Sequence, residues 1–180
     1  MDEKFIRLLK WGGMATLLIY WGFTLWSIYS NPWFSFFHNA LSDLGGGRAN
    51  SPWIYNYGLI IASPFLFLFS VFLIYYAENK LRTVGGAFIL ISSIFLAFIG
   101  VFHSGTRPHG FVSSYFFIQF FFGMLLWGIG AKGLERIPCI SLFLAALLGA
   151  FLPWPSTALI EVYEIFIIAI FAVWIPLHKY

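Results

Sequence analysis

The sequence predicts an all-α integral membrane protein, and the evidence is its composition and its long apolar segments. Of the 180 residues, 61% are hydrophobic and 9% are charged, whereas an average soluble domain has about 25% charged residues. So few ionisable groups cannot cover a water-exposed surface, and lipid is therefore the expected solvent for most of the chain. Aromatic residues make up 22% of the sequence, which is typical of lipid-facing surfaces and interfacial belts.

Six segments are long enough, or nearly so, to cross the membrane, which takes about 20 helical residues. The first follows three basic residues and is longer than the roughly 7–15 apolar residues of a signal peptide, so we expect it to be retained. The second contains Pro64, where a kink is expected, and the fifth is short. We predict a single domain over residues 1–180, with spans at residues 11–29, 54–77, 84–102, 110–131, 137–152 and 157–177.

The charged residues between these segments predict the orientation of the bundle. Only Arg48 and Arg107 lie in the connections on one side, whereas the other side has eight basic residues, namely Lys4, Arg7, Lys10, Lys80, Arg82, Lys132, Arg136 and Lys179. Short loops rich in Lys and Arg stay cytoplasmic, so both the N- and C-termini are predicted to be cytoplasmic. The net charge of +3 thus reflects membrane topology, and no nucleic-acid partner is expected.

Polar side chains with useful chemistry gather on the predicted outward side. Glu161 and Glu164 are three residues apart and share one face of the last helix. They either stabilise the helix N-terminus through its dipole or face the bundle interior and meet groups from the other outer loops. His38 and Ser42 share a face if residues 35–43 are helical, and Asp43 follows directly, so a catalytic nucleophile with its base is one interpretation. An Asx turn at Asp43 is the simpler one.

Two further kinds of site are predicted from the outward loops. His38, His103 and His109, with an acidic partner, have the chemistry to hold a divalent metal such as zinc. Arg48 and Arg107 suit a lipid phosphate, with Asn39 beside them as a further substrate-binding residue, although an ion pair of either arginine with a carboxylate is equally open. The single cysteine, Cys139, excludes an internal disulfide.

Two stretches resemble the domain-of-unknown-function 998 family of prokaryotic membrane proteins. One is His38-Asn39-Ala40-Leu41-Ser42-Asp43-Leu44-Gly45 followed by Trp53-Ile54-Tyr55-Asn56-Tyr57-Gly58-Leu59, and the other runs from Gly100-Val101-Phe102 to His109. The resemblance implies a similar fold and a site at Ser42, Asp43 and His109, but it implies no activity, and position 103 is His where the family pattern has Pro. Residues 37–42 are also similar to a motif of alkaline ceramidases, which are membrane hydrolases with Ser, His and Asp at helix ends.

These patterns leave three classes of function open. The first is a lipid-headgroup-active hydrolase or transferase in the cell membrane, with Asp43, His109, Ser42, Glu161 and Glu164 as the catalytic candidates. The second is a non-catalytic protein that binds lipid or supports a membrane complex, or forms a homo-oligomer. A small-molecule transporter is the third, and the lack of a chain of buried ionisable residues across the bilayer argues against it. Membrane lipids are the expected partners of the protein in the first two of these classes.

Overall fold

The computed structural model describes residues 3–179, and the regular secondary structure of this part of the chain is all helical, without strands. This confirms the predicted all-α fold. In chain order the elements are α1 (Glu3–Leu9), α2 (Gly12–Ser30), the 3₁₀ helix η1 (Leu41–Gly45), α3 (Trp53–Tyr75), α4 (Lys80–Val101), α5 (His109–Gly130), the 3₁₀ helix η2 (Gly133–Glu135), α6 (Arg136–Gly149) and α7 (Thr157–Lys179).

Four helices, α3, α4, α5 and α7, are long and apolar enough to cross a membrane. The chain is therefore a multi-pass membrane protein. The other two predicted spans correspond to α2 and α6. Helix α6 has 14 residues and so is about 21 Å long, less than the roughly 30 Å of the hydrocarbon core, and α2 has several Trp, Tyr, Thr and Ser residues that lower its hydropathy. Six spans therefore remains a prediction.

The predicted segments match the six longer helices to within a few residues, and the largest differences have local causes. Helix α4 begins at Lys80, four residues before the predicted start, because the Asn79 side chain accepts a hydrogen bond from the Arg82 backbone N–H at 3.1 Å and caps the helix. Helix α3 continues through Pro64. A separate short helix, α1, precedes α2 and was not predicted.

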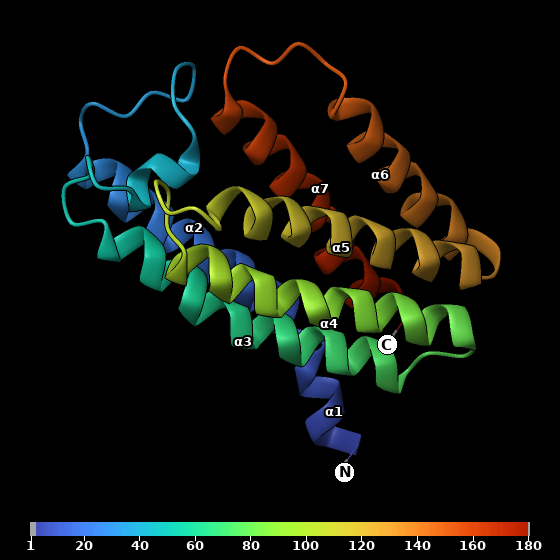
Figure 1. Ribbon diagram of the computed structural model, residues 1–180. Helices are drawn as coiled ribbons and strands as arrows, with labels where there is room; N and C mark the ends of the chain where they lie inside the picture. The colour runs from blue at the N-terminus through green and yellow to red at the C-terminus, as the bar shows by residue number, and fades with distance from the viewer. Residues whose placement is uncertain (1–2, 180) are drawn as a thin grey trace.

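The helices form a bundle whose two ends differ in character (Figure 1). We call the end that carries segments 31–52, 102–108 and 150–156 the outer end, and the opposite end the inner end. Helices α3, α4 and α5 pack side by side, with α2 against α3. Gly85 of α4 and Gly123 of α5 allow two backbones to touch, because a Cβ on either glycine would lie 2.7 Å from the other's carbonyl oxygen.

Helices α5 and α6 form a V that is closed at the inner end. A Cβ on Gly128 would lie 2.8 Å from the Cβ of Cys139, so the two helices are in direct contact there. Toward the outer end they separate, and α7 approaches the open side of the V while making few contacts with α5 (Figure 1). This divergence creates the groove described below.

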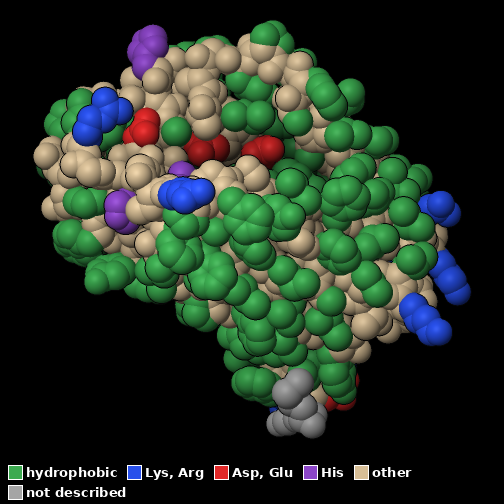
Figure 2. Space-filling view, in the orientation of Figure 1, with side chains coloured by type: hydrophobic (Ala, Val, Ile, Leu, Met, Phe, Trp, Pro, Cys, Tyr) green, Lys and Arg blue, Asp and Glu red, His purple; other side chains and the backbone are tan. Residues whose placement is uncertain are grey.

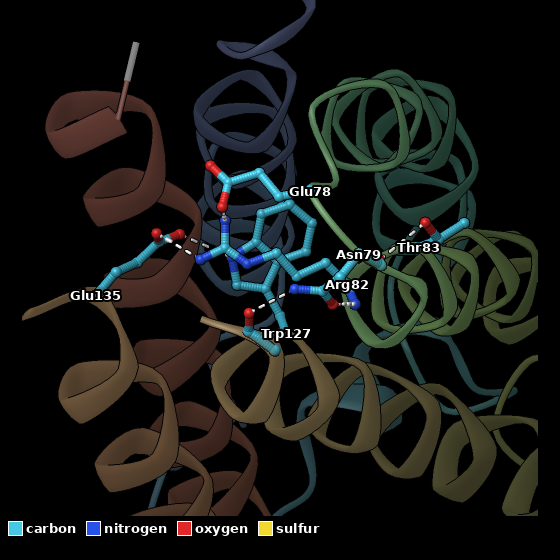
Figure 3. Close-up of polar contacts among 7 residues, drawn as sticks. Glu78, Asn79, Arg82, Thr83, Trp127 and Glu135 are labelled. Atoms are coloured by element: carbon cyan, nitrogen blue, oxygen red, sulfur yellow. Dashed lines mark hydrogen bonds and ion pairs between the residues drawn. The ribbon is translucent and has the colours of Figure 1, made fainter. Parts of the chain in front are cut away.

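A cluster of polar residues holds the inner end together (Figure 3). The Arg82 side chain is 1% exposed, and its Nη2 donates to Glu135 Oε2 at 2.6 Å. Its guanidinium lies 5.0 Å from the centre of the Trp127 ring, and Trp127 Nε1 donates to Glu135 Oε1 at 3.0 Å. The sequence analysis placed Arg82 among the exposed loop charges, but capping by Asn79 draws it into α4, where it joins α4, α5 and η2.

Removing the Glu135 carboxylate should destabilise the protein far more than removing that of Glu78, the second acidic partner of Arg82. Glu135 is 15% exposed, whereas Glu78 is 54% exposed and its Oε2 lies 3.7 Å from Arg82 Nη1. Glu135→Ala leaves a buried charge with its main partner gone, which costs about 3–5 kcal/mol, whereas Glu78→Ala should cost under about 1 kcal/mol. Thermal unfolding in detergent measures both, and equal effects would contradict this assignment.

Candidate functional site

Segments that are far apart in the sequence meet at the outer end. The Asn39 carbonyl oxygen accepts a hydrogen bond from Ala158 N at 2.8 Å, and the Ser156 hydroxyl donates to the carbonyl oxygen of Phe36. Glu161 Oε2 accepts a hydrogen bond from the Leu41 backbone N–H at 2.6 Å. The first outer segment, residues 31–52, is thus attached to the beginning of α7.

Asparagine side chains fix the shape of this outer segment. Asn31 is 1% exposed; its Nδ2 donates to the Ser27 carbonyl oxygen at 2.7 Å, and its Oδ1 accepts from Asn50 N at 2.6 Å. Asn56 Nδ2 donates to the Gly45 carbonyl oxygen at 3.0 Å. Gly45 is required here, because a Cβ would collide with the Asn56 amide oxygen. These bonds join both ends of the segment, and η1, to α2 and α3.

The side chains of Asp43, His103 and His109 all hydrogen-bond to nearby backbone. Asp43 Oδ2 accepts from the Ala40 N–H at 3.0 Å and so caps η1. His109 Nδ1 lies 2.8 Å from the Phe102 carbonyl oxygen, and His103 Nδ1 lies 2.9 Å from that of Ser104. These contacts order the turns before α5.

No three His, Cys, Asp or Glu side chains within residues 3–179 are grouped so that they could hold a metal ion. The metal site predicted at His38, His103 and His109 therefore gains no support from the geometry. Arg48 and Arg107 are exposed, and neither forms an ion pair with a carboxylate in the described part of the chain. Both remain available to a phosphate group, and the Asn39 side chain accepts from Ser35 N at 2.8 Å within its own loop.

Glu161 and Glu164 line a groove between α5, α6 and α7. The groove has a volume of about 410 Å³, and most of its wall is apolar. Acidic side chains lie recessed among hydrophobic ones on this face of the molecule (Figure 2). Both Glu164 and Asp43 are close enough for their negative charges to act on Glu161. The two glutamates, which were predicted to share a helix face, thus lie in one groove.

Behind Glu161 lies a second, internal cavity, which is partly open and is lined by residues of α2, α3, α4, α5 and α7. Its volume is about 60 Å³, and Ser42 of η1, Tyr20 and Tyr55 line it together with Glu161. Ser113, Phe117 and Glu161 line both the groove and this cavity. The structure therefore brings two predicted site residues, Ser42 and Glu161, to one cavity, with Glu161 at its junction with the groove.

Tyr20 and Tyr55 were not predicted from the sequence, although a pattern of polar residues in α2 indicates Tyr20. Thr16, Tyr20, Thr24 and Ser27 recur at helical spacing along α2, and all four are buried. A polar stripe on one face of an otherwise apolar helix marks the side that faces the bundle interior.

The fold and this site define a polytopic helical membrane protein whose polar residues concentrate at one end. The chain belongs to the family described as "Protein of unknown function (DUF998)", whose profile matches residues 14–178. This confirms the resemblance seen in the sequence. No curated protein and no solved structure matches the chain.

Replacing Glu161 should release the outer segment at Leu41. A hydrogen bond to a charged group contributes about 1.5–3 kcal/mol, so Glu161→Ala should speed hydrogen exchange of the Leu41 amide by roughly ten- to a hundredfold. Glu161→Gln retains an acceptor oxygen and should have a smaller effect. Glu164→Ala is the matched control, because Glu164 accepts no hydrogen bond in the described part of the chain. Unchanged exchange in Glu161→Ala would show that this bond does not hold the segment.

Proposed function

We propose that this protein binds a membrane lipid, with the apolar chain in the groove between α5, α6 and α7 and the headgroup at Glu161 and Glu164. The observation that carries the proposal is the groove itself, an apolar channel in the side of a membrane protein that contains two carboxylates. Ionisable groups within a membrane-spanning helix are costly and normally have a functional partner.

The wall of the groove suits a hydrocarbon chain. Phe117, Phe121 and Phe122 of α5 face Phe143 and Leu147 of α6 across it. Its volume of about 410 Å³ lies within the range of roughly 300–1,000 Å³ typical of small-molecule sites. Because the groove lies on a helix surface that contacts lipid, a chain can enter sideways without leaving the bilayer.

The outer end supplies groups for a lipid headgroup. Ser113, Ser114 and Thr157 line the groove near the two glutamates and offer hydroxyls for hydrogen bonds. Arg48 and Arg107 are exposed at this end, where a guanidinium binds phosphate well. Membrane lipids are therefore the proposed partners, and the cell membrane is the proposed location.

Lipid hydrolysis or headgroup transfer is the second candidate function, because Ser42 and Glu161 line the same internal cavity. In this reading Ser42 orients the substrate and Glu161 acts as the acid or base, with Glu164 beside it. Asp43 caps η1, and His109 hydrogen-bonds to the Phe102 carbonyl oxygen. Asp43 and His109 would therefore have positioning roles at the site. Binding without catalysis needs fewer assumptions and is the function we favour.

Filling the groove should displace the lipid. Ala150 lines the groove and is exposed, so Ala150→Trp can fill it without disturbing the core. We expect native mass spectrometry to show about tenfold less retained lipid, equivalent to a loss of about 1.4 kcal/mol in binding. Leu148→Trp is the control, since Leu148 is 66% exposed at the end of α6, two residues before Ala150, and lies outside the groove. Equal retention by the two variants would refute the groove as the binding site.

We further propose six spans, with both termini in the cytoplasm and the outer end outside the cell. Because the native Cys139 is buried, cysteines introduced at exposed positions report the topology. A membrane-impermeant maleimide should label Arg48→Cys in intact cells and label Lys132→Cys only after permeabilisation. The reverse pattern would place the outer end in the cytoplasm, and labelling of both in intact cells would contradict the number of spans.

A further inference from the structure

We propose that the internal cavity behind Glu161 receives the primary ammonium group of a lipid headgroup, with Glu161 as its counter-charge and Tyr20 Oη as a hydrogen-bond acceptor. This deepens the proposed function, on which it rests, by naming the class of lipid. The proposal rests on one observation: a single small cavity contains a carboxylate, a buried hydroxyl without a well-formed hydrogen bond, and aromatic rings.

The buried hydroxyl is that of Tyr20. Tyr20 is 7% exposed and lines the cavity, and its Oη makes no well-formed hydrogen bond in the described part of the chain, although the side chains of Tyr55 and Thr24 lie close enough to interact with it. Two further hydroxyls on the same face of α2, those of Thr24 and Ser27, are also buried without a well-formed hydrogen bond there. Thr24 and Ser27 do not line the cavity, but a buried polar group left unsatisfied costs about 1–3 kcal/mol, so the Tyr20 hydroxyl favours a polar occupant there.

The charge of the cavity determines which polar occupant fits. Glu161 forms no ion pair with any basic side chain in the described part of the chain. Its hydrogen bond from Leu41 N uses one of the roughly four acceptor positions of a carboxylate. Glu164 and Asp43 add negative charge nearby, which repels a phosphate and attracts a cation.

The remaining lining favours an ammonium group over a metal ion. The Tyr20 and Tyr55 rings meet edge to face, with centres 6.4 Å apart, and Phe116 and Phe117 complete the aromatic part of the wall. Aromatic faces attract organic cations, whereas Mg²⁺ and Ca²⁺ require six or more oxygen ligands, which this cavity lacks.

Size and hydrogen bonding favour a primary amine. A volume of about 60 Å³ holds only a few groups the size of water, each of which needs about 10–15 Å³. A primary ammonium has three N–H donors, and Glu161, Tyr20 Oη and the Ser42 hydroxyl, which all line the cavity, offer three acceptors. A trimethylammonium group has no N–H donor and would leave these acceptors unsatisfied.

Three lipids with identical acyl chains test the proposal: phosphatidylethanolamine, phosphatidylcholine and phosphatidylglycerol, supplied in equal amounts in vesicles. We expect native mass spectrometry of the full-length protein to show about a tenfold preference for phosphatidylethanolamine. Glu161→Gln, which retains an acceptor for Leu41, and Tyr20→Phe, which removes one oxygen atom, should each abolish the preference by lowering the retention of phosphatidylethanolamine to that of the other two lipids. Thermal unfolding of both variants verifies that they are folded.

The outcomes separate this inference from the function on which it rests. Equal retention of the three lipids by the wild type, or an unchanged preference in both variants, would overturn the ammonium site but leave lipid binding intact. If Ala150→Trp retained as much of every lipid as the wild type, the groove itself would be refuted. Soluble ethanolamine at millimolar concentration should not displace the lipid, because the groove supplies the rest of the affinity. Displacement by it would show that the cavity binds a free amine and would contradict the lipid assignment.

Discussion

Burial of the Arg82 guanidinium at the inner end is the constraint from which the shape of the bundle follows. A buried cation is stable only with a close partner, and Glu135 is that partner at 2.6 Å, with Trp127 against the guanidinium. Arg82, Trp127 and Glu135 come from α4, α5 and η2, so satisfying one charge fixes three elements. The same end contains the contact of Gly128 with Cys139, which makes it the closed point of the V formed by α5 and α6.

The outer end is more open because, in the part of the chain that the structure describes, no buried ion pair like that of Arg82 and Glu135 closes it. Helix α7 is attached there by the backbone hydrogen bond from Ala158 to residue 39 and by the bond between Glu161 and Leu41, and the Ser156 hydroxyl just before the helix donates to the carbonyl oxygen of residue 36. Glu161 consequently has two roles. One of its oxygen atoms holds η1 in place, and the carboxylate also lines both the groove and the internal cavity. A ligand that binds Glu161 would therefore also affect the position of the outer segment.

Much of the fold follows from the sequence because lipid imposes simple rules. A helix is the structure that satisfies its own backbone in hydrocarbon, so the apolar segments locate the helices to within a few residues. Burial of Arg82 was not predictable from the charge pattern, because a basic residue near a helix end looks the same whether it faces water or a carboxylate 53 positions later. The start of α4 was missed for the same reason, since it depends on the Asn79 cap.

The candidate site was predictable to a similar degree. The spacing of Glu161 and Glu164 predicted a shared face, and both line the groove. Ser42 was singled out for its neighbours in the sequence, whereas the structure places it beside Glu161 and Tyr20, which are remote in the chain. Tyr20 was missed because a tyrosine in an apolar helix is common, and only the repeat of Thr16, Tyr20 and Thr24 distinguishes it. Distances between helices, which decide whether a cavity exists, have no counterpart in a single sequence.

The central claim is that closure of the inner end leaves an outer groove that holds a lipid chain. Cross-linking with a phospholipid that carries a photoactivatable diazirine in its acyl chain tests it most directly, with the labelled residues located by mass spectrometry. If the groove holds a lipid chain, the labels should concentrate on Phe121, Phe143 and Leu147, which line the groove. Labels spread evenly over lipid-facing residues outside the groove, such as Leu18 and Ile94, which are also exposed, would contradict it.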